Sequence, residues 1–193
     1  MYDYLKGSLV EKNPTHIILD VGGIGYMVNI SLTTYSKIKD LENIKIYIHF
    51  VVREDAQLLY GFADITERIL FGHLITVSGV GTNTARLILS SLSTEEAFDA
   101  IVQSKADVLQ AVKGIGGKTA QRIIIDLKDK LMKSGIEHEK IDNTHNTIRE
   151  EALSGLLILG FNKPAVEKAL NSVLKSNKAI SIEGLIKESL KML

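Results

Sequence analysis

The feature that most constrains the fold is a nine-residue pattern that occurs twice in the middle of the chain. Val77 to Ala85 reads VSGVGTNTA and Val112 to Ala120 reads VKGIGGKTA, so both copies follow V-x-G-[V/I]-G-x-x-T-A. Each copy follows a helical segment and opens another. Glycines permit a tight turn between two helices, and the apolar residue between them can enter a small core. The pattern predicts two helical hairpins in a compact all-helical domain.

A helix that begins directly after such a turn presents free backbone N–H groups and the positive end of its dipole. Phosphate groups bind at such ends, and glycines let them approach closely. Contacts of this kind read no base, so they predict sequence-independent DNA binding. A single copy is explained equally well as a plain helix connection, but two copies at matched helix boundaries favour DNA binding. The formal net charge is +0, so binding must rest on placed donors rather than on a basic surface.

Other ligands find little support in the sequence. Gly114 to Thr119 ends like a phosphate-binding loop of ATPases, but Val112 stands where that loop needs its first glycine, and no strand precedes it. Gly22 to Gly25 has no third glycine and no following helix, so it does not indicate a dinucleotide. The five histidines are scattered and there is no cysteine, which gives metal chemistry no support. We expect no cofactor and no metal.

The first third of the chain has the pattern of strands. Short runs rich in β-branched and apolar residues alternate with turn residues, which indicates five strands. The expected strands are Leu5 to Val10, Thr15 to Val21, Tyr26 to Ile30, Ile44 to Ile48, and Leu58 to Phe62. Five short strands in so few residues predict a small barrel of the OB-fold type over residues 1–63.

From residue 64 the period becomes helical. Three segments look like capped helix starts, namely Asp64 with Glu67, Ser93 with Glu96, and Ser104 with Asp107, and a last helix is expected from Lys118 to Met132. Residues 64–133 are therefore expected to form the helical domain. Residues 134–147 are polar and without period, which predicts a flexible linker.

Three further helices are expected after that linker, in a small bundle over residues 148–193. The expected helices are Ile148 to Leu159, Lys163 to Leu174, and Ile182 to Met192. Asn162 and Ser181 are suitable N-caps, and Pro164 fits a first turn. The whole chain is predicted to be α+β and multidomain. The absence of cysteine and of any apolar run of roughly 18 residues predicts a soluble intracellular protein.

Two carboxylates stand where a DNA-binding protein would not be expected to place them. The stretch from His49 to Phe62 reads HFVVREDAQLLYGF, two strand-like runs around Arg53-Glu54-Asp55-Ala56. A hairpin tip kept in solvent by its charge explains this pattern. It does not explain why the charge is negative, since DNA phosphates repel carboxylates.

The hairpin string, the two glycine motifs and the C-terminal bundle, in this order, make the chain resemble the RuvA family of bacterial Holliday-junction branch-migration subunits. The resemblance covers essentially the whole chain. It implies that the OB-fold assembles four subunits at a four-way junction, and the sequence does not distinguish four bound subunits from eight. It implies that the tandem helix-hairpin-helix domain grips the duplex arms, and that the C-terminal domain contacts the RuvB motor ATPase. The RuvC junction resolvase is a further implied partner.

The resemblance also implies roles for individual residues. The acidic pair of the family, called the acidic pin, corresponds to Glu54 and Asp55. Thr82-Asn83 stands where members of the family often carry Pro-Lys, so one cationic contact is missing. The implied phosphate-binding residues are Gly79, Gly81, Thr82, Asn83, Gly114, Gly116, Gly117, Lys118 and Arg122. Leu156, Leu159 and Phe161 are candidates for the motor contact, although a place in the bundle core explains each of them as well.

Two other functions remain open at this point. A helix-hairpin-helix glycosylase or nuclease would need a catalytic Lys or Asp in a cleft. Asp126 and Asp129 alternate with lysines, as on a solvated helix face. A general repair scaffold would bind any duplex, and comparing binding to four-way and linear DNA distinguishes it from a junction-specific protein. The resemblance implies a protein that catalyses no bond change itself.

Overall fold

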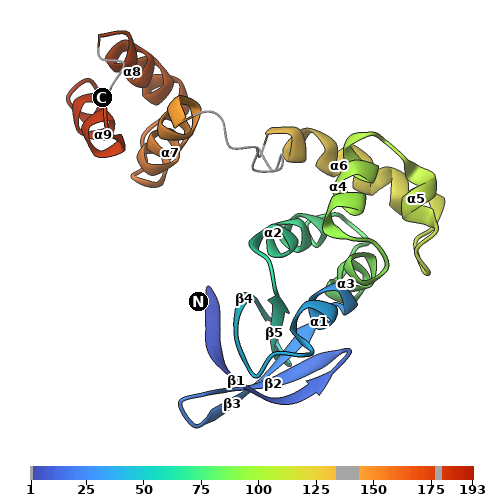
Figure 1. Ribbon diagram of the computed structural model, residues 1–193. Helices are drawn as coiled ribbons and strands as arrows, with labels where there is room; N and C mark the ends of the chain where they lie inside the picture. Colours follow the sequence, from blue (N-terminus) through green and yellow to red (C-terminus); the bar gives the residue numbers. More distant parts are fainter. Residues whose placement is uncertain (1, 134–143, 177–179) are drawn as a thin grey trace. The chain divides into compact units, whose positions relative to one another are not determined.

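The structure is a computed structural model that describes residues 2–133, 144–176 and 180–193 (Figure 1). The chain divides into two compact units, Met1–Ile136 and Glu137–Leu193. The predicted flexible linker lies outside the described residues from 134 to 143. Its last four residues already belong to a helix, because α7 (Thr144–Ile158) begins four residues before the expected start.

Five strands close into a barrel in the order β1-β2-β3-β5-β4. All neighbouring strands are antiparallel except β3 and β5, which are parallel. The strands are β1 (Tyr4–Asn13), β2 (His16–Val21), β3 (Ile24–Ile30), β4 (Asn43–Val52) and β5 (Gln57–Phe62). The predicted five-stranded barrel is therefore confirmed, with strands longer than expected at several ends.

The barrel interior follows from the period-two pattern of its strands. Ile17 and Leu19 of β2 are fully buried, and so is Ile46 of β4. Gly61 of β5 is required by this packing, because a Cβ there would lie 2.5 Å from a methyl group of Val28 and 2.7 Å from one of Ile46. The glycine in the LLYGF string thus keeps the barrel closed.

A short helix between β3 and β4 was not predicted. This helix, α1 (Leu32–Ile38), begins at Ser31, whose hydroxyl accepts a hydrogen bond from the Thr34 amide. With seven residues, several of them β-branched, the segment shows no helical period. In Figure 1 it lies beside α3 (Thr82–Ser91), which it contacts. Helix α1 thus gives the barrel a side on which α3 packs.

The remaining helices of the first unit share one core with the end of the barrel. They are α2 (Ile65–Leu74), α3, α4 (Thr94–Val102), α5 (Ala106–Gln110) and α6 (Gly117–Lys133). Phe71 of α2 is fully buried, with its ring centroid 5.1 Å from that of Tyr60 and 4.9 Å from that of Phe62. Since both partners come from β5, the barrel and the helices are packed as one body.

Of the three expected capping boxes only one is present. Ser93 and Glu96 form the reciprocal pair at the start of α4, as predicted. Ser104 does not cap α5, because it has a φ of 58° and the N-cap is Lys105. Asp64 is the N-cap of α2 but makes no side-chain cap bond; it pairs with Lys37 instead.

Glu67, the second member of that failed box, lies on α2 and is fully buried against the start of α1. Its carboxylate accepts hydrogen bonds from the Ser31 hydroxyl and, at 2.8 Å, from the Thr34 hydroxyl. The Thr34 hydroxyl in turn accepts from the Ala63 amide at 3.0 Å. Burial raises the pKa of Glu67, and the two hydroxyl bonds and Lys37 oppose this only in part.

The raised pKa makes stability depend on pH in a defined direction. The pKa of Glu67 is higher in the folded protein than in the unfolded chain, so folding favours the protonated side chain. The stabilisation that this gives is fully present below the unfolded pKa. It is lost as pH rises through the folded pKa. We expect the free energy of unfolding of wild type, minus that of Glu67→Gln, to fall from pH 4.5 towards neutral pH, as measured by urea unfolding.

Glu96→Gln is the matched control for that experiment. Hydrogen bonds from Ser93 lower the pKa of Glu96. The free energy of unfolding of wild type, minus that of Glu96→Gln, should therefore rise with pH. A difference for Glu67 that stays constant or rises with pH would contradict the burial argument.

The described residues of the second unit form three helices, α7, α8 (Lys163–Ser176) and α9 (Ile182–Leu190). Ser181 caps α9 as predicted, with its hydroxyl accepting from the Gly184 amide, and Pro164 lies in the first turn of α8. Their shared core is apolar, with fully buried residues Ala152, Leu156, Val166, Leu170 and Leu185.

Candidate nucleic-acid interface

The two sequence repeats fold into hairpins of the same geometry. Gly79 and Gly114 both have a φ of 89°, a conformation that glycine adopts without strain. In each hairpin the amide after the glycine donates a hydrogen bond to the carbonyl of the valine two residues before that glycine. Val80 donates to Val77 and Ile115 to Val112, both at 3.0 Å. The repeat therefore encodes one structure twice, between α2 and α3 and between α5 and α6.

The apolar residue inside each hairpin anchors it. Val80 and Ile115 are 4% and 5% exposed, and both belong to the core that the five helices share. An anchored turn cannot swing, so the backbone on its outer side is held in place. The prediction that this residue enters the core is confirmed.

The helix that follows each hairpin starts at a glycine and lacks a side-chain cap. The Gly81 carbonyl accepts from the Ala85 amide and the Gly116 carbonyl from the Ala120 amide, both at 2.9 Å, which makes each glycine the first residue of its helical turn. A Cβ added at Gly79, Gly81, Gly114 or Gly116 would meet nothing within 4 Å. The N-terminal amides of α3 and α6 are thus open to an anion from outside.

The expected polar ligands around these ends are distributed unevenly. Asn83 is exposed in the first turn of α3, and Lys118 is exposed in the first turn of α6. Arg122, one turn further along α6, reaches the other hairpin: its guanidinium lies 3.2 Å from the Ser78 hydroxyl and 3.4 Å from the Ser78 carbonyl. The arginine of the second motif therefore places its charge beside the first.

Thr82 lies differently from the other expected ligands. Its side chain is only 5% exposed, and its hydroxyl oxygen accepts a hydrogen bond from Arg53 at 3.0 Å and from the Tyr60 hydroxyl at 2.9 Å. The hydroxyl therefore lies inside the protein, between the barrel hairpin and the first motif. A side chain this buried is badly placed to reach a phosphate from solvent, so the expectation for the Thr82 side chain is corrected.

The carboxylates of Glu54 and Asp55 stand at the tip of the hairpin between β4 and β5. The Arg53 amide donates to the Ala56 carbonyl at 2.8 Å, which closes the tip. Both acidic residues are exposed, and neither forms an ion pair or hydrogen bond with any part of the chain that the structure describes. Two adjacent unpaired carboxylates repel any phosphate that comes near them.

Arg53 is a residue whose place the sequence did not reveal. The sequence shows the tip as one charged tetrapeptide, but the guanidinium of its exposed arginine donates a hydrogen bond to Thr82 of the first hairpin motif. The partners lie 29 residues apart, and no local pattern links them. The barrel hairpin and the first motif are thereby in direct contact.

The candidates for a motor contact in the second unit separate into two groups. Helix α7 ends in a glycine cap in which the Gly160 amide donates to the Leu157 carbonyl and the Phe161 amide to the Leu156 carbonyl. In this cap the two residues that flank the turn meet in the core. Leu156 is fully buried and Phe161 packs on the same core, whereas Leu159 is 62% exposed. Of the three, Leu159 is the one whose side chain is mostly exposed, while Phe161 is partly buried.

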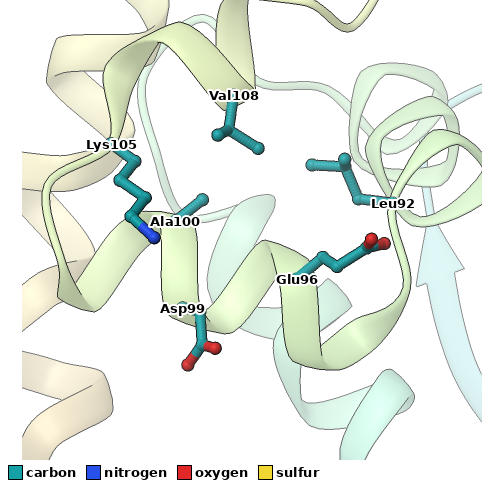
Figure 2. Close-up of a pocket in the computed structure, with 6 residues that line it drawn as sticks. All are labelled: Leu92, Glu96, Asp99, Ala100, Lys105 and Val108. Carbon is teal, nitrogen blue, oxygen red and sulfur yellow. The ribbon is translucent and has the colours of Figure 1, made fainter.

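One pocket lies elsewhere, between α4 and α5. Figure 2 shows Leu92, Ala100 and Val108 pointing into it and Asp99 pointing away. Its other lining residues are Glu96, which serves the cap of α4, and Lys105. The two acidic side chains make it unsuited to phosphate.

The described residues contain no cluster of three or more side chains suited to a metal ion. None of their helices combines the length and the apolar character that a membrane crossing requires.

Comparison with protein families gives three matches in chain order. Residues 1–61 match the RuvA N terminal domain, residues 71–129 match the SAM-like helix-hairpin-helix tandem, and residues 147–193 match the RuvA C-terminal domain. The first match covers the barrel, the second covers both hairpins, and the third covers the bundle.

Several curated relatives are similar along their full length. Proteins named Holliday junction branch migration complex subunit RuvA are 49% identical in Christiangramia forsetii, 48% in Parabacteroides distasonis and 47% in Porphyromonas gingivalis. In each comparison the match spans 100% of this chain and 100% of the relative.

Proposed function

This chain belongs to the RuvA family, and we propose that it binds four-way DNA junctions through their phosphates and recruits a motor for branch migration. One observation carries the proposal: two hairpins of equal geometry each place bare helix amides beside glycines with open space in front of them. This arrangement recognises a DNA backbone without reading its bases. It also accounts for DNA binding by a chain with a net charge of +0.

Each hairpin would hold one stretch of backbone. In the first, the phosphate meets the amides around Gly81 and Asn83, with Arg122 adding positive charge from the neighbouring helix. In the second, it meets the amides after Gly116 and the ammonium group of Lys118. Four subunits would then offer eight hairpins to the four arms of a junction.

Glu54 and Asp55 would act at the centre of the junction. Their exposure and lack of partners support a role in repulsion rather than in folding. Carboxylates at the crossover would keep the separated strands from re-pairing there. They would also penalise a linear duplex, whose phosphates would have to cross the same point.

The chain would itself break no covalent bond, and the energy of branch migration would come from the RuvB ATPase bound to the second unit. Leu159 supports this assignment, since it is a large apolar side chain left in solvent beside a rigid glycine cap. RuvC would act on the junction that the tetramer holds open.

Leu159→Asp is expected to weaken motor binding at least about tenfold, because a charge in the centre of an apolar contact is strongly unfavourable. Titration of RuvB ATPase stimulation on junction DNA measures this. Leu41→Asp, the same change at an exposed leucine of the first unit, is the control. If Leu159→Asp stimulates the motor as well as the control does, Leu159 is not part of the motor contact.

The proposal as a whole is tested by comparing the affinity for a four-way junction with that for a linear duplex of the same sequence. The general duplex-binding scaffold is the second candidate, and it requires equal affinity for the two.

A further inference from the structure

One face of α3 carries a line of polar residues that is turned towards the barrel. Thr82, Arg86 and Ser90 are spaced by four residues and so lie on the same side of the helix. The Arg86 guanidinium donates to the Thr15 carbonyl at 3.1 Å and to the Asn29 amide oxygen at 3.3 Å. These contacts attach the helix of the first motif to the barrel at successive turns.

The other end of that line contacts α1, the short helix that follows β3. The Ser90 hydroxyl accepts from the Leu32 amide at 3.0 Å, and the Thr33 hydroxyl donates to the Leu89 carbonyl at 2.6 Å. Helix α3 is thus fixed at its end and in its middle, and Val80 anchors the hairpin before it. The remaining contact, made by Thr82, ties this fixed helix to the hairpin between β4 and β5.

Thr82 joins two parts with opposite effects on DNA. Its backbone lies in the first turn of α3, where the proposed phosphate site is, and its hydroxyl holds Arg53, the residue next to Glu54 and Asp55. Arg53 also closes the tip through its amide bond to Ala56. One buried hydroxyl thus connects the carboxylates that repel DNA with the amides that attract it.

We propose that Thr82 is a positioning residue, which fixes the acidic tip relative to the first phosphate site and thereby sets the preference for four-way junctions over linear duplex. The inference rests on the proposed function of both parts. A carboxylate penalises a linear duplex only if it stays in the path of that duplex, since repulsion weakens with distance. A tip released from Thr82 can move aside, and the penalty is then reduced.

The test removes the hydroxyl and follows selectivity in the full-length protein. Thr82→Val keeps the shape of the side chain but offers Arg53 no acceptor. We expect the ratio of duplex to junction dissociation constants to fall roughly threefold to tenfold, given the cost of misplaced like charges. Hydrogen exchange at the Arg53 amide, which closes the tip, should become faster. Thr82→Ser retains the oxygen, so its ratio of dissociation constants and its exchange rate at the Arg53 amide should equal those of the wild type.

Tyr60→Phe separates positioning from stability. It removes the other hydrogen bond to the same oxygen and leaves Arg53 attached, so it should lower the unfolding temperature without changing selectivity. The double variant Tyr60→Phe with Thr82→Val buries no unpaired tyrosine hydroxyl. It should show the selectivity of Thr82→Val, which provides a second variant if the single one folds poorly.

The outcomes distinguish this inference from the function on which it rests. A wild-type preference for junctions that is unchanged in both Thr82→Val variants overturns the inference alone. Equal loss of selectivity in Tyr60→Phe and Thr82→Val also overturns it, because Thr82 would then act only through stability. A wild-type protein with no preference for junctions overturns the proposed function and the inference together.

Discussion

Replacing Gly81 and Gly116 together by aspartate is expected to weaken junction binding at least about 100-fold, while the protein keeps or gains stability. Gly81 has a φ of −83° and a ψ of 174°, the extended conformation of an ordinary N-cap, and a side chain there meets nothing. Aspartate is among the best N-caps, so each helix should gain a few tenths of a kcal/mol. The same carboxylate occupies the amides that a phosphate would use and repels that phosphate.

The opposite signs of the two effects make this variant informative. Most substitutions that weaken binding also weaken the fold, but here the unfolding temperature should stay level or rise. Thr94→Asp is the control for the added charge of each substitution, Gly81→Asp or Gly116→Asp. It places one aspartate in the first turn of α4, a helix outside the hairpins. A doubly substituted protein that binds junctions as tightly as wild type would contradict the role of the amides.

Glu54→Gln combined with Asp55→Asn is expected to keep or tighten junction binding and to reduce the preference over linear duplex at least about tenfold. Both substitutions preserve the shape of the side chains and remove two charges. Neither carboxylate has a partner in the described part of the chain, so no buried group loses a bond. Parallel titrations of junction and duplex give the ratio directly.

The control for the tip is an acidic pair elsewhere on the barrel. Asp40→Asn with Glu42→Gln makes the same charge change between α1 and β4, and it should leave the preference unaltered. A folded tip variant that no longer binds junctions would show that the carboxylates attract or organise the DNA. That result would reverse the sign of the role given to Glu54 and Asp55.

The sequence was most informative where short-range rules decide the structure. Three features depend on neighbours a few residues apart and were predicted: the two glycine motifs, the buried apolar residue inside each hairpin, and the strand period. Local patterns also misled: Asp64 and Glu67 have the spacing of a capping box, but Glu67 bonds Ser31, which is 36 residues away. No rule confined to one helix can anticipate a partner on the barrel.

The candidate site shows the same division. Gly79, Gly81, Gly114 and Gly116 lie where the motif placed them, whereas Thr82 shares the motif and is turned inwards by Arg53 and Tyr60. The line of polar residues along α3 has a period of four and was available as a signal. It was missed because polar residues on a helix more often face solvent than a neighbouring domain.

The second unit adds a case in which one residue decides the outcome. Leu156 and Leu159 are three apart and would share a face if the helix continued. Gly160, with a φ of 93°, instead ends α7 in a cap that keeps Leu156 in the core and leaves Leu159 in solvent. The Leu-Gly-Phe sequence at this point is the signal that would have separated the two leucines.

The most direct test of the central claim is a band-shift titration of the wild-type protein on two DNAs of equal length and sequence, one a four-way junction and the other a linear duplex. The account predicts that the junction binds on the order of 100-fold more tightly, and that this ratio is the same for junctions of unrelated sequence. Equal affinity for the two DNAs, or a preference that changes with the sequence of the arms, would contradict it.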